Sequence, residues 1–287
     1  FSNTSLVPVV NTVPGVRMEE RSPGSYRLSM RGSLLRSPFG IRNIKVYWND
    51  FILTDAGGNT YLNLVDFNSV GQMELLKGPA GSIYGAGTGG VVVLQSPSFL
   101  NNNIEPEKKH EFDVRLTAGS YGQFSESIRW QSGTKNVRWQ LIQGHYQSDG
   151  YRSNSRMRRD MIQGNLVAQT GERNRIEALL LLSDLAYRTP GGLNLAQKNA
   201  DPTQSRPATP VLPSAAEQKA GIYNKTLMVG LSNVFMFSEK WQNVSSLTTA
   251  LTGFENPFIS NYEKRKENNL GVRTKFVYSS PIGKVHL

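Results

Sequence analysis

The sequence has 287 residues, no cysteine, three histidines and a formal net charge of +10 at pH 7. The lack of cysteine excludes disulfides and thiolate metal sites, and three scattered histidines argue against a histidine-based catalytic or metal cluster. The positive charge suits anionic partners such as nucleic acid, lipid headgroups or an anionic ligand. No apolar run approaches the roughly 20 residues of a membrane-spanning helix.

The first hundred residues are rich in glycine and predict short elements. Leu6 to Thr12 favours a short helix, which Val13-Pro14-Gly15 ends. Strands are expected at 26–32, 41–48 and 73–76, with a helical turn at 62–67. This pattern indicates a compact mixed α+β unit.

Gly85, Gly87 and Gly90 fit the G-x-G-x-x-G spacing of dinucleotide-binding loops. That function needs a helix directly after the glycines and an acidic residue about 20 residues further on. Gly90 is instead followed by the β-branched run 91–94, which favours a strand. We therefore expect a tight strand–loop–strand connection in which glycine fills positive-φ positions, and no nucleotide site.

A polar stretch at 101–107 precedes a region of long strands in which apolar and polar residues alternate. The alternation is clear at Glu111 to Ala118 and at Thr226 to Ser238, whereas Ile176 to Leu185 is apolar on both faces. Eight complete strands are expected, and a ninth from Gly283: 108–119, 122–132, 136–149, 159–170, 174–187, 222–238, 241–254 and 268–280. Such strands reach the ~9–11 residues that a tilted membrane-spanning strand needs.

The connections between these strands alternate in length. Short ones at 132–135, 171–174, 238–240 and 281–283 alternate with longer ones at 150–158, 188–221 and 255–267, and Ser120-Tyr121 is the exception. Hairpins with short turns at one end and long loops at the other are typical of outer-membrane barrels. Trp241, beside a short turn, is expected in an interfacial aromatic girdle. The connection 188–221 is a candidate cover for the barrel mouth, because loops of that length are usually functional or disordered.

At this point the sequence resembles a TonB-dependent outer-membrane receptor of the siderophore-receptor type. The segments that carry the resemblance are Val13-Pro14-Gly15-Val16, Met30-Arg31-Gly32, 46–53 and MELLKGPAGSIY at 73–84 with 85–93 after it. The last of these contains the plug-motif residues Gly78, Pro79, Tyr84, Gly85 and Gly90. Asn49-Asp50 departs from the usual Asp-Gly pair, a change at the level of a turn. In the second region, DGYRSNS at 149–155 resembles a recurring barrel segment.

The resemblance implies a mainly β fold with an N-terminal α+β plug followed by antiparallel transmembrane β-barrel strands. Residues 1–100 would form the plug domain, truncated at its N-terminus. Residues 107–287 would form the first eight or so strands of a barrel of about 22 strands. We therefore expect an internal fragment, with the TonB box and the remaining strands outside this sequence.

The function implied by the resemblance is TonB-dependent uptake of a scarce nutrient across the bacterial outer membrane. A ferric siderophore or other ferric chelate is the expected cargo, with cobalamin, haem or a glycan as alternatives. The expected partners are TonB, outer-membrane lipid and lipopolysaccharide, and a siderophore-type ligand, but no nucleic acid. No catalytic residue, metal site or covalently bound cofactor is expected, because no bond is made or broken.

The resemblance also implies roles for single residues. Arg31 and Lys77 are expected to latch the plug to barrel glutamates outside this sequence. Arg36, Phe39 and Tyr61 are candidate ligand contacts on outer plug loops, since they offer charge and stacking surface. The lumen is expected to be polar and hydrated, so that many modest hydrogen bonds and ion pairs hold the plug instead of a dry apolar core.

Two other classes of protein stay open on the sequence. A soluble β-rich adhesin or lectin would need a second sheet over the apolar face of 227–237. A nucleic-acid binder would need clustered basic residues with aromatic residues between them. Arg156, Arg158 and Arg159 cluster, but in an expected loop.

Overall fold

The computed structural model describes residues 5–20, 23–32, 41–78, 81–85, 89–97, 110–258, 261–280 and 283–286. Its strands form a two-stranded, a four-stranded and a nine-stranded sheet. We call the described residues between 5 and 97 the inner unit, and the nine-stranded sheet the wall. In these ranges, no helix has the length and apolar character needed to cross a membrane.

The inner unit contains the two smaller sheets. Its helices are α1 (Val7–Val10), α2 (Gly81–Tyr84) and the 3-10 helices η1 (Leu62–Leu64) and η2 (Phe67–Ser69). Strands β1 (Val16–Glu20) and β2 (Tyr26–Met30) pair with each other. Strands β3 (Ile44–Trp48), β4 (Phe51–Ile52), β5 (Gln72–Lys77) and β6 (Gly90–Gln95) form the second sheet in the order β4-β3-β6-β5. The elements predicted for this region are confirmed, while β1, β4 and α2 were not predicted.

The glycine-rich stretch ends in a strand, as predicted, and not in a helix. Gly90 begins β6 with φ 139°, a conformation that residues with a Cβ avoid. A Cβ there would also collide with the carbonyl oxygen of Leu76 and lie 2.7 Å from the Met30 sulfur. Glycine is therefore required at this position by backbone conformation and by close packing.

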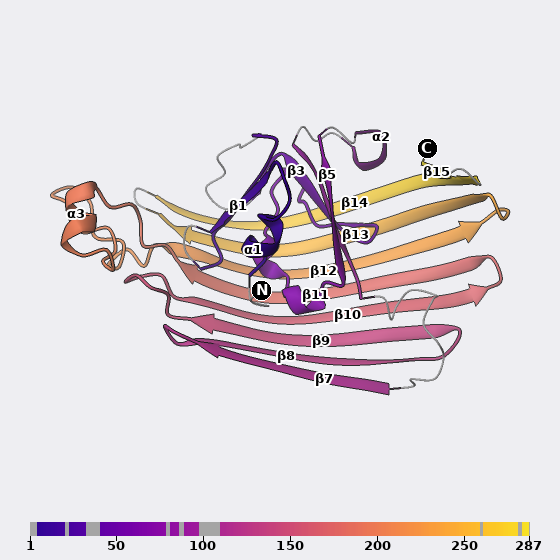
Figure 1. Ribbon diagram of the computed structural model, residues 1–287, viewed down its shortest axis with the longest axis horizontal. Coiled ribbons are helices and arrows are strands. Elements are labelled where there is room, and N and C mark those ends of the chain that lie inside the picture. The colour runs from indigo at the N-terminus through magenta and orange to yellow at the C-terminus, as the bar shows by residue number, and fades with distance from the viewer. Residues whose placement is uncertain are drawn as a thin grey trace.

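The wall is an uninterrupted series of antiparallel hairpins, with strand order identical to chain order (Figure 1). Its strands are β7 (His110–Gly119), β8 (Gln123–Gly133), β9 (Val137–Ser148), β10 (Met157–Gly171), β11 (Asn174–Arg188), β12 (Gly221–Met236), β13 (Trp241–Pro257), β14 (Tyr262–Ser280) and β15 (Gly283–His286). Eight long strands and the start of a ninth are thus confirmed. Residues 98–109 lie outside the described ranges, so the division into domains at 1–100 and 107–287 stays a prediction.

Two sequence-based boundaries are wrong. The expected long connection 255–267 is mostly strand, because β13 extends to Pro257 and β14 begins at Tyr262. Glu255 and Lys264 lie opposite each other on the two strands and form an ion pair at 2.7 Å. Strand β10 begins at Met157, so Arg158, which was expected in a loop, lies in the strand. Arg159, the first residue of the expected strand 159–170, points to the inner face, where it lies 3.5 Å from Asp66. A run of charges resembles a loop in sequence, although a strand with two polar faces accommodates it equally well.

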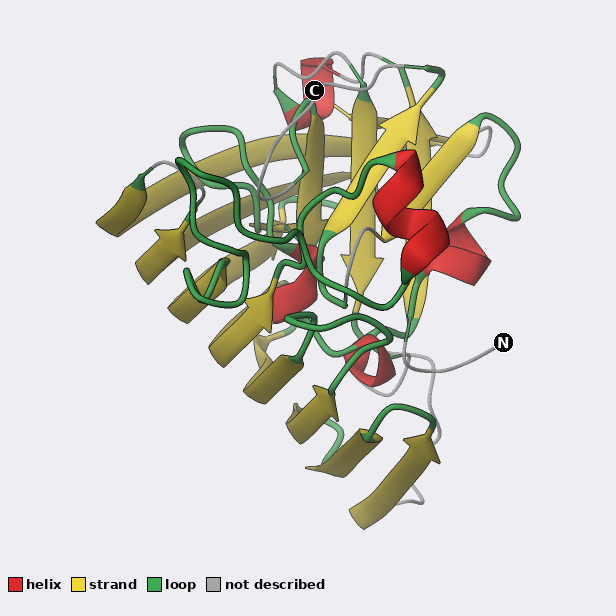
Figure 2. Ribbon diagram, turned by 90° about the vertical axis from the view of Figure 1, so that its left-hand side faces the viewer, coloured by secondary structure: helices red, strands yellow, loops and turns green. Residues whose placement is uncertain are grey.

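The face of the wall that points away from the inner unit is apolar. Val229 and Leu231 are 42% and 54% exposed, while Thr226 and Ser232 on the opposite face are buried. This alternation is as predicted for 226–238. The smaller sheets lie on the inner face (Figure 2) and leave the outward apolar face uncovered in the described part of the chain. A soluble adhesin would have to cover that face.

The inner face is not uniformly polar, which corrects the expectation of a wholly wet lumen. Leu179, Leu181 and Met228 point inward and share one apolar cluster with Trp48 and Phe51 of the inner unit. This contact explains why Ile176 to Leu185 is apolar on both faces. Leu179 and Leu181 meet the inner unit, whereas Leu180 and Leu182 point outward.

Candidate functional site

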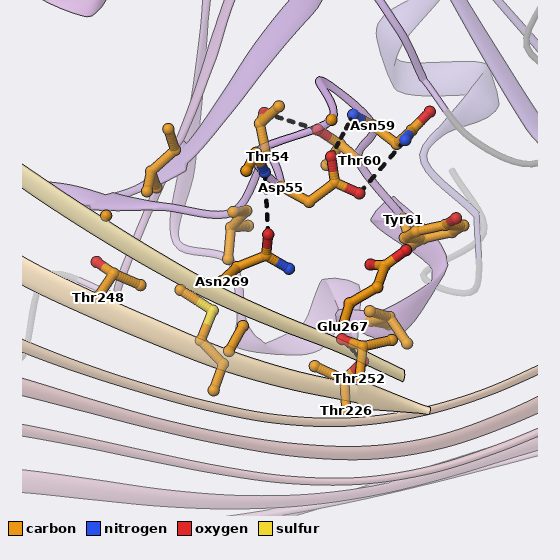
Figure 3. Close-up of a pocket in the computed structure, with 18 of the residues that line it drawn as sticks. Thr54, Asp55, Asn59, Thr60, Tyr61, Thr226, Thr248, Thr252, Glu267 and Asn269 are labelled. Atoms are coloured by element: carbon orange, nitrogen blue, oxygen red, sulfur yellow. Dashed lines mark hydrogen bonds between the residues drawn. The ribbon is translucent and has the colours of Figure 1, made fainter. Parts of the chain in front are cut away.

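A cavity of about 450 Å³ lies between the inner unit and the wall (Figure 3). One side is formed by residues 52–61, which begin at the last residue of β4, and the other by residues of β11 to β14. The lining is rich in hydroxyl groups and includes Thr54, Thr60, Thr226, Thr248 and Thr252. Apolar side chains such as Leu53, Leu181 and Met228 also line the cavity, which can therefore offer both hydroxyl groups and apolar contacts to a ligand.

The loop on the inner-unit side is a compact turn held by its own side chains. The Asp55 carboxylate accepts a hydrogen bond from the backbone N–H of Asn59 at 2.8 Å. The hydroxyls of Thr54 and Thr60 lie 2.7 Å apart, and the Thr54 hydroxyl also accepts from the backbone N–H of Val46 at 2.8 Å. Because these bonds satisfy the loop internally, it presents a defined surface to the cavity.

The same loop contacts the wall at two points. The backbone N–H of Ala56 donates to Oδ1 of Asn269 at 3.1 Å. Tyr61 accepts a hydrogen bond from Arg265 at 2.8 Å, and its ring lies 5.8 Å from the ring of Phe254. Burial raises the pKa of the Tyr61 hydroxyl to about 12, so this group stays protonated at neutral pH. These contacts fix the position of the loop relative to the wall.

Of the three predicted ligand contacts, the structure describes Tyr61, which lines the cavity. Arg36 and Phe39 lie outside the described residues. The charged lining residues are Lys45, Asp55 and Glu267, so the overall charge of +10 is not concentrated here. A role for Tyr61 in ligand binding stays a prediction. In the described ranges, no group of three or more His, Asp or Glu side chains is arranged to hold a metal ion.

The two predicted latch residues, Arg31 and Lys77, lie on the surface of the inner unit. Lys77 donates a hydrogen bond to the carbonyl oxygen of Pro14 at 3.0 Å. Arg31 has φ 52°, and its guanidinium lies over Gly78. Neither side chain forms an ion pair with a carboxylate within the described residues. Their pairing with barrel glutamates stays a prediction.

The structure shows an ion pair between the inner unit and the wall that was not predicted. In the predicted latches the base lies on the plug and the acid on the barrel, and here the two are exchanged. Asp66 of the inner unit and Arg159 of β10 lie 3.5 Å apart, with side chains that are 3% and 7% exposed. Arg159 also donates to the carbonyl oxygen of Val65 at 2.8 Å, and Asp66 accepts from the backbone N–H of Asn68 at 2.8 Å. The acid is thus on the inner unit and the base on the wall.

A second contact of the same polarity centres on Asp50, whose position in the sequence suggested only a turn. Its carboxylate forms ion pairs with Arg273, at 3.0 Å, and with Lys275. The hydroxyl of Ser246 donates to the Asp50 carbonyl oxygen at 3.0 Å. Asp50 therefore binds two neighbouring wall strands, β13 and β14. Arg273 and Lys275 alternate with the apolar residues Val272 and Phe276, so the period of two places both bases on the inward face, but nothing in the sequence names their partner.

Arg273 also connects the wall to the glycine-rich motif. Its guanidinium lies over the rings of Tyr47 and Tyr84, at 4.9 Å and 4.8 Å from the ring centroids. It donates to the carbonyl oxygen of Ile83 at 3.1 Å. Gly78 and Gly85, which lie before and after α2 in the chain, have positive φ. Pro79 is outside the described residues. The described motif residues therefore shape a surface that docks on the wall.

These features define a class of protein. A hairpin sheet with strands of up to 19 residues, an apolar outward face and a small α+β unit on its inner face has the architecture of an outer-membrane barrel with an internal plug. Residues 1–92 match the family model of the TonB-dependent Receptor Plug Domain. Residues 1–92 therefore form a TonB-dependent receptor plug domain. The chain as a whole has the fold of the plug and partial barrel of such receptors.

Solved structures agree with this fold. The ferric citrate transporter FecA matches with a TM-score of 0.75 and 16% identity, over 99% of this chain and 44% of FecA. The ferric yersiniabactin uptake receptor FyuA from Yersinia pestis matches with a TM-score of 0.69 and 13% identity, over 98% and 48%. The copper transporter OprC matches with a TM-score of 0.59 and 14% identity, over 98% and 50%. The chain thus spans half or less of the length of these three proteins.

Proposed function

We propose that the protein takes up a ferric siderophore or another ferric chelate across the outer membrane, in a process driven by TonB. The observation that carries the proposal is the cavity between residues 52–61 of the inner unit and the inner face of the wall. A ligand in that cavity would contact the plug and the barrel together. Occupancy would thereby be coupled to the element that has to move during transport.

The contacts between the inner unit and the wall indicate why an external force is needed. Moving the inner unit away would break the ion pairs of Asp66 and Asp50 and expose Leu179, Leu181 and Met228 to water. Exposing a large apolar side chain costs about 1.5–3 kcal/mol. The polar contacts can exchange with water during the movement, whereas the apolar contacts resist spontaneous opening. In our proposal TonB supplies the work, through an N-terminal box and the proton gradient of the inner membrane.

The cargo class is supported by the neighbours whose names specify ferric citrate and ferric yersiniabactin. The copper transporter among them shows that this fold also serves other metals. Cobalamin, haem and glycans remain alternative cargoes of the same transport mechanism. Binding and passage of any of these cargoes involve no covalent chemistry, so we propose no enzymatic activity. We also propose that lipid and lipopolysaccharide contact the apolar outward face.

The test is growth of a strain that lacks the full-length gene, on a panel of single ferric chelates. The panel extends to copper, haem, cobalamin and glycans. We expect a growth defect on one ferric chelate, restored by the wild-type gene. A gene with Tyr61→Ala should restore growth only at higher chelate concentration. Tyr262→Ala, a tyrosine change outside the cavity, should restore growth fully. Unchanged growth of the deletion strain on every ferric source would refute the ferric proposal.

A further inference from the structure

The DGYRSNS segment has no role in the cavity or in the contacts with the inner unit. It lies in residues 149–156, which connect β9 and β10, and we call this connection the clasp. Beside it are residues 189–220, which connect β11 and β12, and we call these the rim connection. The rim connection contains α3 (Leu195–Ala200) and extends beyond the ends of the strands (Figure 1).

Arg152 of the clasp binds the backbone of the rim connection at two separate places. Its Nε and Nη2 donate to the carbonyl oxygen of Gln204, at 3.0 Å and 2.9 Å. Its Nη1 donates to the carbonyl oxygen of Gly191 at 2.9 Å. The rigid fork of a guanidinium suits this double contact, which the single ammonium group of a lysine cannot reproduce. One side chain thus ties the start of the rim connection to its middle.

Asn154 joins the two ends of the rim connection. Its Nδ2 lies 2.9 Å from the carbonyl oxygen of Thr189, 3.2 Å from that of Ala215 and 3.1 Å from that of Ala220. Its φ of 56° is a left-handed conformation that asparagine tolerates better than most residues. The neighbouring backbone N–H of Ser153 donates to the carbonyl oxygen of Thr203 at 2.7 Å.

The rim connection is also stiff in itself. It contains five prolines, at positions 190, 202, 207, 210 and 213, and each of them fixes one backbone angle. Arg206 donates to the carbonyl oxygen of Pro213 and to the side chain of Gln218, both at 2.8 Å. Ala215 and Ala220 are almost fully buried. A loop that closes over a ligand would need fewer internal contacts than these.

We propose that Arg152 and Asn154 are positioning residues, which hold the rim connection in one preformed conformation. In this arrangement the rim connection forms a fixed side of the entrance, and it does not act as a lid that moves when a ligand binds. This assignment gives the DGYRSNS segment a purpose that the sequence did not indicate. The ordering of the rim connection by these two side chains does not depend on the identity of the cargo, whereas its place at the entrance rests on the proposed function.

The test measures a distance between two spin labels in the whole receptor. The sequence contains no cysteine, so labelled cysteines at Leu195 on α3 and at Lys225 on β12 report the position of the rim connection. Both side chains are exposed. We expect one narrow distance distribution, which the ferric chelates of the growth panel leave unchanged. We expect a broad distribution in Arg152→Ala and in Asn154→Ala.

The matched control is Arg156→Ala, in the same clasp. Arg156 is 67% exposed, and its guanidinium contacts Asp149 at 3.8 Å, so its removal should leave the distribution narrow. Arg152→Lys should broaden the distribution as Arg152→Ala does, because the fork is lost although the charge remains. A broad distribution in the wild type would overturn the proposal. So would a shift on addition of a chelate, or a distribution in Arg152→Ala and Asn154→Ala as narrow as in the control.

Discussion

Replacing Arg159 by alanine should loosen the inner unit more than any change to an exposed charge. Arg159 and Asp66 form a buried pair, and removing one partner of such a pair costs about 3–5 kcal/mol because the other charge stays uncompensated. Asp66 keeps its hydrogen bond from the backbone N–H of Asn68, which favours the lower half of that range. A loss of 3 kcal/mol corresponds to a more than hundredfold rise in the equilibrium constant for opening.

The assay follows a single cysteine at Val46, which is fully buried in the inner unit, in the whole receptor. The rate at which a thiol reagent modifies it at moderate urea concentration reports how often the inner unit opens. In Arg159→Ala this rate should rise at least a hundredfold. Arg158→Ala is the matched control. Arg158 is the neighbouring residue on the opposite face of β10, and it is 48% exposed. Its surface ion pairs contribute at most about 1 kcal/mol.

Equal labelling rates in Arg159→Ala and Arg158→Ala would refute the view that the buried pair secures the inner unit. A second change separates charge from packing. Asp66→Asn in the Arg159→Ala protein should recover part of the loss, because it removes the uncompensated carboxylate. If Asp66→Asn brings no recovery, the cost arises from lost packing of the arginine and not from its charge.

Three further predictions use the same labelling assay. Asp50→Asn should lower the free energy of opening the inner unit by about 1–3 kcal/mol, because two charge-assisted contacts to the wall are lost. A smaller rise in labelling rate than in Arg158→Ala would contradict this. Burial raises the pKa of Tyr61 from 10 to about 12, so its proton stabilises the folded state fully below pH 10 and this contribution is lost as pH rises from 10 towards 12. The rise in opening over that range should be smaller in Tyr61→Phe. Gly144→Ala should increase opening, because the added Cβ would lie 2.5 Å from the Asp66 carboxylate. In Gly164→Ala the nearest atom to the added Cβ is the Cβ of Leu180 at 3.7 Å, so the labelling rate should not change.

The arrangement of the wall follows from the sequence because it depends on local pattern. Alternation with a period of two decides which side chains share a face, and it placed Leu227, Val229 and Leu231 outward as the structure shows. The same rule failed at 255–267, where both faces of the strands are polar and the pattern carries no signal. Antiparallel backbone pairing continues there from Glu255 opposite Lys264 to Pro257 opposite Tyr262, and it keeps those residues in the sheet.

The candidate site was only partly accessible to such an argument. Tyr61 was predicted as a ligand contact, and that role stays a prediction. The structure places Tyr61 in the lining of the cavity and adds its contacts with Arg265 and Phe254. The hydroxyl-rich lining comes from four wall strands and one inner-unit loop. No spacing in the sequence brings these residues together, because each strand supplies between one and four of them at a height set by the register of the sheet.

The sequence by itself determined that this protein is a plug followed by long hairpin strands, because motif, strand length and alternation are properties of neighbouring residues. Only the tertiary structure decided how the two parts hold each other. Asp66 meets Arg159, and Asp50 meets Arg273 and Lys275, across large separations in the chain. The pattern shows that a charged side chain points inward, but its partner is set by how the inner unit docks. That docking depends on the shapes of two surfaces, which no local pattern encodes.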